Sequence, residues 1–242
     1  MYILNKYAQF YDEFLKDKNY TALRIIREFD VESIEELCEK KSTKKEQAFV
    51  SAQNTLNAFY VAGSIKVIEK IKEYCIKEVI RKVRIIGPAY GMHSKLVDSL
   101  VELLKLYYHK IKFNDLQVPL ITNVDGVYVT TAAALESAIM RKINNRILWL
   151  EVMKGFDGCD VIISVGPGTQ LIEWFKEIYP DKEYHAIISM KDFAAIEYLF
   201  KPIEVSEPTT EKVSEQPVDE KKNLYDADVV NERATDFDDD EE

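Results

Sequence analysis

The order of apolar segments between residues 21 and 86 is the feature that most constrains the fold. Strand patterning is expected at residues 21–26, 47–50, 58–62 and 81–86, and helix spacing at residues 31–39 and 65–75. Asp30 fits an N-cap for the first helix, and a polar turn around residues 53–55 joins the two middle strands. Strand, helix, strand, strand, helix, strand is the order of a split β-α-β unit, so the sequence predicts a ferredoxin-like small subdomain.

The flanking segments also alternate between helix and strand patterns. A helical stripe of apolar side chains runs through residues 2–18. Further helices are expected at residues 94–108, 132–142, 148–156 and 170–178, and strands at residues 118–123, 161–165 and 185–188. This alternation predicts an α/β fold with the α+β subdomain inserted into it.

The negative charge of the 242-residue chain is concentrated at its C-terminal end. The net charge is -10, yet residues 203–242 alone hold 15 acidic and four basic side chains, so the remainder is nearly neutral. So acidic a segment cannot bury enough apolar surface to offset its chain entropy, and residues 202–242 are expected to be a disordered acidic tail. The tail is interpreted either as a solubilising segment or as a docking segment for a basic partner, with Leu224, Tyr225 and Phe237 as apolar anchors.

Composition narrows the class of protein. Hydrophobic residues make up 47% of the chain, but no apolar run approaches the ~20 residues of a membrane span. Met1 is not followed by the basic and apolar regions of a signal peptide. We therefore expect a cytoplasmic protein without a membrane partner. Because no basic stripe with interleaved aromatic residues occurs, no nucleic-acid partner is expected either.

Cysteine and histidine are too scattered to predict a metal site or a disulfide framework. The residues concerned are Cys38, Cys75, Cys159, His93, His109 and His185. We expect no metal and no cofactor.

Several motifs occur in the order of one known family. Residues 52–63 resemble its Asn-rich turn and the strand after it, and residues 111–115, 118–119 and 122–125 resemble a later stretch. Residues 90–97, Tyr-Gly-Met-His-Ser-Lys-Leu-Val, resemble the segment that carries a catalytic histidine. Residues 145–149 resemble an Asn-Pro-Val-x-Trp helix start, and residues 165–168 with Leu171 resemble a Val-Gly-Pro-Gly-x-x-Leu signature. Over roughly residues 20–200 the chain resembles the malonyl-CoA:acyl-carrier-protein transacylase family, which includes the acyltransferase domains of polyketide synthases.

The resemblance implies an α/β-hydrolase-like acyltransferase domain with a ferredoxin-like small subdomain. Residues 1–20 would be a helix of the large subdomain, residues 21–88 the small subdomain, residues 89–201 the C-terminal part of the large subdomain, and residues 202–242 the tail. The family's Gly-His-Ser-x-Gly segment lies before the first helix, and no Gly-x-Ser-x-Gly occurs in this sequence. We therefore expect a truncated member in which residues 118–123 and 161–165 lack neighbouring strands and expose apolar surface.

Family members move a malonyl group from coenzyme A to a carrier-protein thiol through an acyl-serine, and the resemblance places some of the working residues. His93 falls on the position of the general base. The arginine that binds the malonyl carboxylate would lie on the first helix, where the nearest matches are Asn5 and Lys6, and a lysine cannot form the bidentate fork. Lys142 replaces a glutamine that helps to orient the histidine. The candidate substrate-binding residues are Lys6, Asn54, Arg141 and Lys142.

Four functions stay open at this point. The altered positions favour a catalytically incomplete protein that binds an acyl carrier protein or synthase component and assists its assembly. The alternative is a subunit of a split malonyltransferase, for which malonyl-CoA would be a ligand and a partner chain would supply the missing N-terminal half with its serine nucleophile. The third is a gene fragment whose true start lies upstream. The fourth is a coenzyme A-thioester hydrolase with a cysteine nucleophile.

Overall fold

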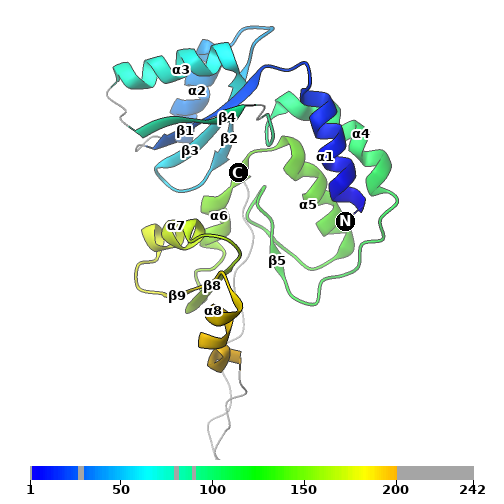
Figure 1. Ribbon diagram of the computed structural model, residues 1–242, viewed down its shortest axis with the longest axis vertical. Coiled ribbons are helices and arrows are strands. Elements are labelled where there is room, and N and C mark those ends of the chain that lie inside the picture. The colour runs from blue at the N-terminus through cyan, green and yellow to red at the C-terminus, as the bar shows by residue number, and fades with distance from the viewer. Residues whose placement is uncertain (1, 27–29, 79–81, 89–90, 201–242) are drawn as a thin grey trace, which may run out of the picture. The chain divides into compact units, whose positions relative to one another are not determined.

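The computed structural model describes residues 2–26, 30–78, 82–88 and 91–200 (Figure 1). The described residues from Tyr2 to Leu199 belong to one compact unit. The acidic tail predicted for residues 202–242 lies outside the described residues. Within the described ranges no helix is both long enough and apolar enough to cross a membrane, and the cytoplasmic location stays a prediction.

An antiparallel sheet confirms the predicted order of elements in the N-terminal part. Its strands, in spatial order, are β4 (Lys82–Pro88), β1 (Tyr20–Ile26), β3 (Ala58–Ser64) and β2 (Ala48–Gln53). Helices α2 (Val31–Lys41) and α3 (Ile65–Lys77) follow β1 and β3 and pack on the sheet (Figure 1). Each helix connects two parallel strands that have a third strand between them, which is the split β-α-β arrangement of a ferredoxin-like sheet.

The core of this part lies between the sheet and its two helices. Leu23, Ile25, Phe59 and Val61 of the central strands have no exposed surface. They pack against a stripe of α3 whose members are Val67, Ile68, Ile71 and Cys75. The members recur at helical spacing, so the helix buries one face and leaves the other to solvent. Helix α2 begins at its predicted N-cap, where the Asp30 carboxylate accepts a hydrogen bond from the Ser33 N–H at 2.6 Å.

A fifth strand joins this sheet from far along the chain. Strand β7 (Ile147–Leu148) pairs in parallel with β2 and is followed at once by α6 (Trp149–Lys154). The sequence predicts a helix that starts at Leu148. In the structure Leu148 belongs to the strand, because it lies opposite Gln53 and its N–H donates to the Asn123 carbonyl at 2.7 Å. Strand β7 therefore ties the C-terminal part of the chain to the first sheet.

Three helices share a second apolar cluster. They are α1 (Tyr2–Leu15), α4 (Asp98–Tyr108), which follows the short 3-10 helix η1 (Lys95–Val97), and α5 (Ala132–Asn144). Val97, Leu100, Leu104 and Ile143 form the buried centre of the cluster. The rings of Phe10 and Tyr107 lie 4.8 Å apart and link α1 to α4. The helices predicted at residues 2–18, 94–108 and 132–142 are thus present, with changed ends.

Of the remaining predicted strands, the one at residues 161–165 is present with its predicted bounds, the one at residues 185–188 begins two residues earlier, and the one at residues 118–123 is much shorter. Strand β5 (Leu120–Ile121) pairs with β6 (Tyr128–Val129) in place of the expected strand at residues 118–123. Strand β8 (Val161–Val165) pairs in parallel with β9 (Glu183–Ile187), and a third apolar cluster packs them against α7 (Gln170–Ile178). Helix α8 (Met190–Ala195) and the 3-10 helix η2 (Glu197–Phe200) follow.

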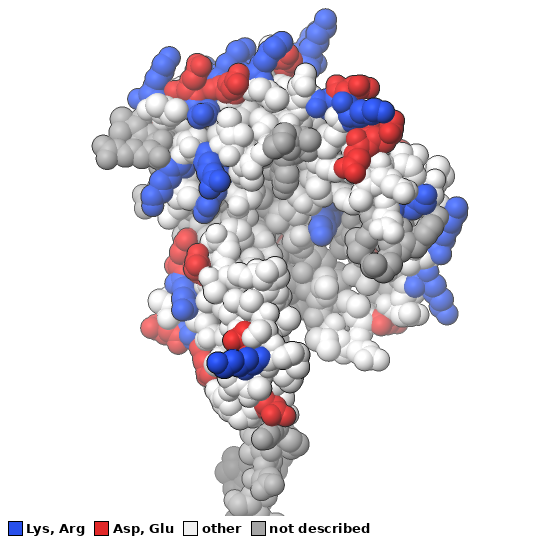
Figure 2. Space-filling model, viewed as in Figure 1, with Lys and Arg blue, Asp and Glu red and all other residues white. Residues whose placement is uncertain are grey.

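Large apolar side chains are exposed around these short strands, as expected for strands with few neighbours. The most exposed are Val118, Val127, Tyr128, Val165, Ile188 and Met190. On the face shown in Figure 2, the charged side chains of both signs are intermixed over the region of α2 and α3. The predicted fold class, a mixed α/β fold with an α+β subdomain, is confirmed. The boundaries between residues 1–20, 21–88 and 89–201 stay predictions.

Candidate functional site

The backbone around His93 is held in an unusual conformation. His93 has a φ of 59°, the only positive φ of a non-glycine residue among those described. Its N–H donates to the Ile143 carbonyl at 2.9 Å, and the next residue, the buried Ser94, donates its hydroxyl to the Gly91 carbonyl at 2.7 Å. A left-handed conformation is costly for a residue with a Cβ, and such residues cluster at functional sites.

The imidazole of His93 is oriented by a backbone carbonyl. Its Nδ1 lies 2.6 Å from the carbonyl oxygen of Lys142, in the last turn of α5. A carbonyl only accepts, so Nδ1 carries the proton and Nε2 has the free lone pair. Among the described residues none forms a hydrogen bond with Nε2. In this tautomer Nε2 is the ring nitrogen that is able to accept a proton.

The environment of His93 also keeps it neutral. Burial lowers the pKa of His93 below its usual value, and the nearby charge of Lys142 lowers it further, against the opposing effect of the Lys142 carbonyl. A histidine with a lowered pKa is unprotonated near pH 7 and can accept a proton.

The sequence could not reveal this role of Lys142. Its side chain differs from the glutamine that the resemblance leads one to expect, but the contact to His93 is made by its main chain. The last carbonyls of a helix have no partner within the helix, and α5 ends at Asn144. A residue of any type at position 142 has this main-chain carbonyl. The replacement of glutamine by lysine therefore leaves the contact that orients the His93 ring in place.

Tyr11 is a residue of the site that the sequence did not point to. From α1 its hydroxyl accepts a hydrogen bond from the Gly91 N–H at 3.3 Å, and burial raises the pKa of Tyr11 above its usual value. The Tyr7 ring stacks on it, with centroids 5.9 Å apart. Helix α1 thus supports the loop that carries His93.

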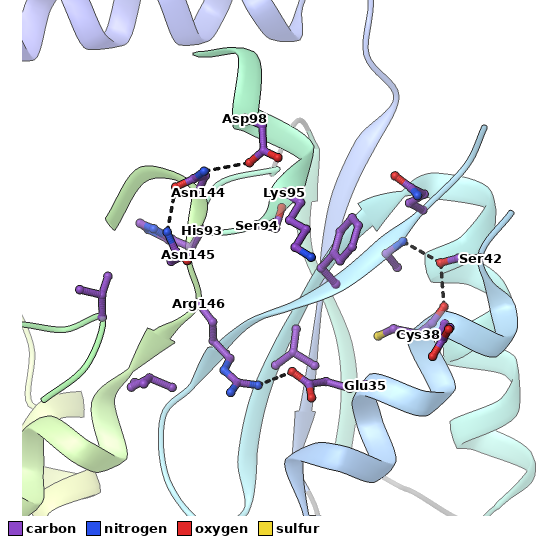
Figure 3. Close-up of a pocket in the computed structure, with 17 residues that line it drawn as sticks. Glu35, Cys38, Ser42, His93, Ser94, Lys95, Asp98, Asn144, Asn145 and Arg146 are labelled. Atoms are coloured by element: carbon purple, nitrogen blue, oxygen red, sulfur yellow. Dashed lines mark hydrogen bonds and ion pairs between the residues drawn. The ribbon is translucent and has the colours of Figure 1, made fainter. Parts of the chain in front are cut away.

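His93 borders a polar cavity of about 730 Å³ (Figure 3). On one side the cavity is lined by α2 and β2, and on the other by η1 and the segment from α5 to β7. The Arg146 guanidinium and the Glu35 carboxylate form an ion pair of 2.6 Å between these two sides. Asn144 donates to the Asp98 carboxylate at 2.9 Å. A polar or charged ligand of substantial size would find hydrogen-bond partners here.

On its other side His93 borders an apolar cavity of about 390 Å³. Helices α1, α4 and α5 and the loop after α4 line it. The lining residues are Tyr7, Met92, His93, Tyr108, Ile111, Phe113, Ile139, Lys142 and Ile143. The histidine therefore stands between a polar and an apolar space.

The predicted substrate-binding residues are not gathered around His93. Of the four, Lys142 borders the apolar cavity, and Lys6, Asn54 and Arg141 line neither cavity. Lys6 donates to Gln9 at 3.1 Å on α1, and Arg141 forms a 2.7 Å ion pair with Asp125. Asn54 is only 2% exposed, and its Nδ2 has no hydrogen-bond partner among the described residues. Their roles toward a substrate stay predictions.

The hydroxyl and thiol groups that line the polar cavity with His93 are not poised as nucleophiles. Ser42 donates its hydroxyl to the Cys38 carbonyl at 2.7 Å, and Ser94 donates to Gly91. Burial raises the pKa of the Cys38 thiol to about 12, so it is not a thiolate at neutral pH. This argues against a cysteine hydrolase at this cavity. Within the described ranges no group of three His, Cys, Asp or Glu side chains could hold a metal ion.

Comparisons with known proteins identify relatives of the chain. No family model matches it. The malonyl CoA-acyl carrier protein transacylase of Haemophilus influenzae is 23% identical over 178 residues, which are 73% of this chain and 57% of that protein. The protein of the same name from Bacillus subtilis is 20% identical over 180 residues, 74% of this chain and 56% of that protein. The chain thus spans little more than half the length of these curated relatives.

Solved structures agree on the fold. An acyl carrier protein S-malonyltransferase from Vibrio cholerae matches with a TM-score of 0.70 at 20% identity, over 79% of this chain and 64% of that one. A malonyl-transacylase solved in complex with a type II PKS acyl-carrier protein matches with a TM-score of 0.74 at 20% identity, over 81% and 64%. These matches confirm the fold predicted from the resemblance.

Proposed function

We propose that this chain, a relative of the malonyl CoA-acyl carrier protein transacylases, supplies the general base of an acyl-transfer site whose nucleophile comes from outside the described residues. The observation that carries the proposal is the orientation of His93, with Nδ1 on the Lys142 carbonyl and Nε2 without a partner among the described residues. A histidine that served only for packing would not need its ring fixed in this tautomer, its pKa lowered and its backbone held at a positive φ.

In the proposed reaction a serine hydroxyl attacks the carbonyl carbon of an acyl-coenzyme A thioester. The Nε2 of His93 takes the hydroxyl proton, and the Lys142 carbonyl stabilises the resulting imidazolium through Nδ1. The C–S bond then breaks, and His93 returns the proton to the departing sulfur. Coenzyme A therefore leaves as a thiol. In the second half a carrier-protein thiol gives its proton to His93 and its sulfur forms a C–S bond to the acyl carbon of the acyl-serine. The ester C–O bond then breaks, and His93 returns the proton to the serine oxygen.

The names of the relatives suggest the two substrates. We take malonyl-CoA as the acyl donor and an acyl carrier protein as the acceptor, because the curated relatives bear that name and one solved relative was captured with a carrier protein. The polar cavity beside His93 offers Lys95, Asn144 and Asn145 to the polar arm of such a thioester. Another polypeptide is the proposed source of the serine.

A second candidate is a binding or assembly protein without catalysis. It is favoured by Lys6, which stands nearest to the expected arginine, is held by Gln9 and lines neither cavity. A lysine in this place does not bind a carboxylate bidentately. The two candidate functions differ in one point: acyl transfer requires the imidazole of His93, whereas binding or assembly does not.

The test uses the full chain, tagged and purified from its own cells with whatever binds it. The purified material is incubated with malonyl-CoA and carrier protein, and the intact mass of each polypeptide is measured for wild type and for His93→Gln. We expect an acyl adduct on a copurifying polypeptide or on the carrier protein, lost in His93→Gln and kept in His109→Gln, a control at an exposed histidine. An adduct on this chain itself would refute the proposed division of roles. If carrier protein copurifies in the same amount and with the same mass for wild type and for His93→Gln, the assembly role is established instead.

A further inference from the structure

The apolar cavity beside His93 has a lining unlike that of the polar one. Seven of its nine lining residues are aromatic or aliphatic, and the other two are His93 and Lys142. Tyr108 and Ile143 are the most deeply buried of the lining residues, at 8% and 4% exposed. The walls come from the half-buried Tyr7, Phe113 and Ile139. Cavities of this size with mainly apolar walls and a few polar groups at one end are typical binding sites for small apolar ligands.

The position of His93 between the two cavities determines which end of a bound ligand would lie beside the imidazole. Because the same side chain lines both cavities, a ligand could place a reactive carbonyl at the imidazole, its polar part in the polar cavity and its apolar part in the apolar cavity. A carboxylate at the far end of the acyl group would enter an apolar space, which is costly without a bidentate partner. Arg141 is occupied by Asp125, and Lys142, which lines the cavity, is exposed to solvent.

We propose that the apolar cavity binds an uncharged hydrocarbon acyl chain, with the thioester carbonyl at His93. This rests on the proposed acyl-thioester chemistry and adds a second class of acyl group to the malonyl group, which is short and ends in a carboxylate. The cavity of about 390 Å³ has room for a chain of several methylene groups. Each buried methylene group contributes about 0.8 kcal/mol, so affinity is expected to rise about three- to fourfold per methylene until the cavity is filled.

The proposal is tested by titrating the full chain with butanoyl-, hexanoyl- and octanoyl-pantetheine and with malonyl-pantetheine. Calorimetry measures the affinity, and the NMR signal of the His93 ring reports whether the carbonyl end lies there. We expect affinity to rise with chain length, the His93 signal to shift, and malonyl-pantetheine to bind more weakly than hexanoyl-pantetheine. Affinity that ignores chain length, or stronger binding of malonyl-pantetheine, would overturn the proposal.

Two variants locate the binding. Ile139→Trp enlarges a wall residue of α5 and is expected to weaken octanoyl-pantetheine binding at least tenfold. Leu106→Trp makes the same kind of change at a 65% exposed position of α4 that does not line the cavity, and it should bind like wild type. If Ile139→Trp fails to fold, Phe113→Ser in the loop after α4 takes its place, with a loss of binding expected. Equal affinity in the cavity variant and the control would place the ligand elsewhere.

The outcome is distinguishable from failure of the proposed function. Chain-length-dependent binding with a shifted His93 signal, but no acyl adduct on any polypeptide, would leave the acyl cavity standing and remove the transfer reaction. A His93-dependent malonyl adduct without apolar binding would do the reverse. Absence of binding for every thioester would overturn the cavity proposal.

Discussion

The positive φ of His93 can be tested by comparing two substitutions at the same position. His93→Ala and His93→Gly both remove the imidazole and its contact to Lys142, so their difference isolates the backbone. Alanine must keep its Cβ in the left-handed region at a φ of 59°, whereas glycine adopts that region freely. We therefore expect His93→Gly to be the more stable variant.

The expected difference follows from two opposing effects. Relief of left-handed strain favours glycine by about 1–2 kcal/mol. The greater freedom of glycine in the unfolded chain disfavours it by about 0.4–1 kcal/mol. The net advantage of His93→Gly over His93→Ala is therefore about 0.8 kcal/mol from the midpoints of the two ranges, and about 1.6 kcal/mol at most. In a domain of this size about 0.8 kcal/mol corresponds to about 2–3 °C in Tm.

Urea unfolding followed by circular dichroism measures both variants and a matched pair. Glu102 lies inside α4 with a side chain that is 71% exposed, so Glu102→Ala should be more stable than Glu102→Gly by about 1 kcal/mol, the opposite sign. If His93→Ala proves as stable as His93→Gly or more so, while the Glu102 pair behaves as expected, the loop is not held at this φ in solution. The argument that strain marks the functional site would then be refuted.

Three further predictions concern the core, a close strand contact and pH. Phe59→Ala removes a ring with no exposed surface from the centre of β3 and should lower the free energy of unfolding by about 3–5 kcal/mol in urea titrations, and a loss under 1 kcal/mol would contradict the core described here. Gly63→Ala would place a Cβ 2.6 Å from the Cβ of Ala48 and should destabilise by about 1–3 kcal/mol, whereas Gly158→Ala, where nothing lies within 4 Å of the added atom, should be within about 0.5 kcal/mol of wild type. Because the pKa of His93 is lowered on folding, the unfolded chain binds the proton more tightly. The stability contribution is therefore complete above the unfolded pKa of about 6.5 and is lost as the pH falls below it through the folded pKa, a loss that His93→Gln should lack in unfolding experiments between pH 7.5 and 5.

Local patterns in the sequence predicted much of the fold. The apolar runs that became β1 and β3 are strongly β-forming, and the stripe of α3 keeps helical spacing over its whole length. Both signals reside in neighbouring residues. Strand β7 was missed because two residues carry no periodicity, and its pairing depends on Ala52 and Gln53 in a distant segment. The strand predicted at residues 118–123 is limited to Leu120–Ile121, because only these two residues pair with β6.

The candidate site was predictable in its central residue only. The motif predicts His93 as the general base, a role that stays a prediction, and the structure adds the contact of its Nδ1 with the Lys142 carbonyl. The groups that fix it are carbonyls of Lys142 and Ile143 and the hydroxyl of Tyr11, which reaches Gly91 from another helix. Every residue type has a main-chain carbonyl, so the sequence does not indicate which carbonyls will accept a hydrogen bond from His93. A contact between helices is equally invisible before the chain has folded.

The parallel pairing of β7 with β2 sets the order in which the site can form during folding. The hairpin of β2 and β3 closes over a short loop, whereas β7 returns to the sheet after α4 and α5 have been passed along the chain. Closing the longer loop costs more chain entropy, so we expect this contact to form after the four-stranded sheet. Lys142 and Ile143, which contact His93, lie in the last turn of α5, a few residues before β7. The histidine is therefore aligned in one of the last steps, and a molecule halted with only its first sheet formed would have a folded core but no oriented base.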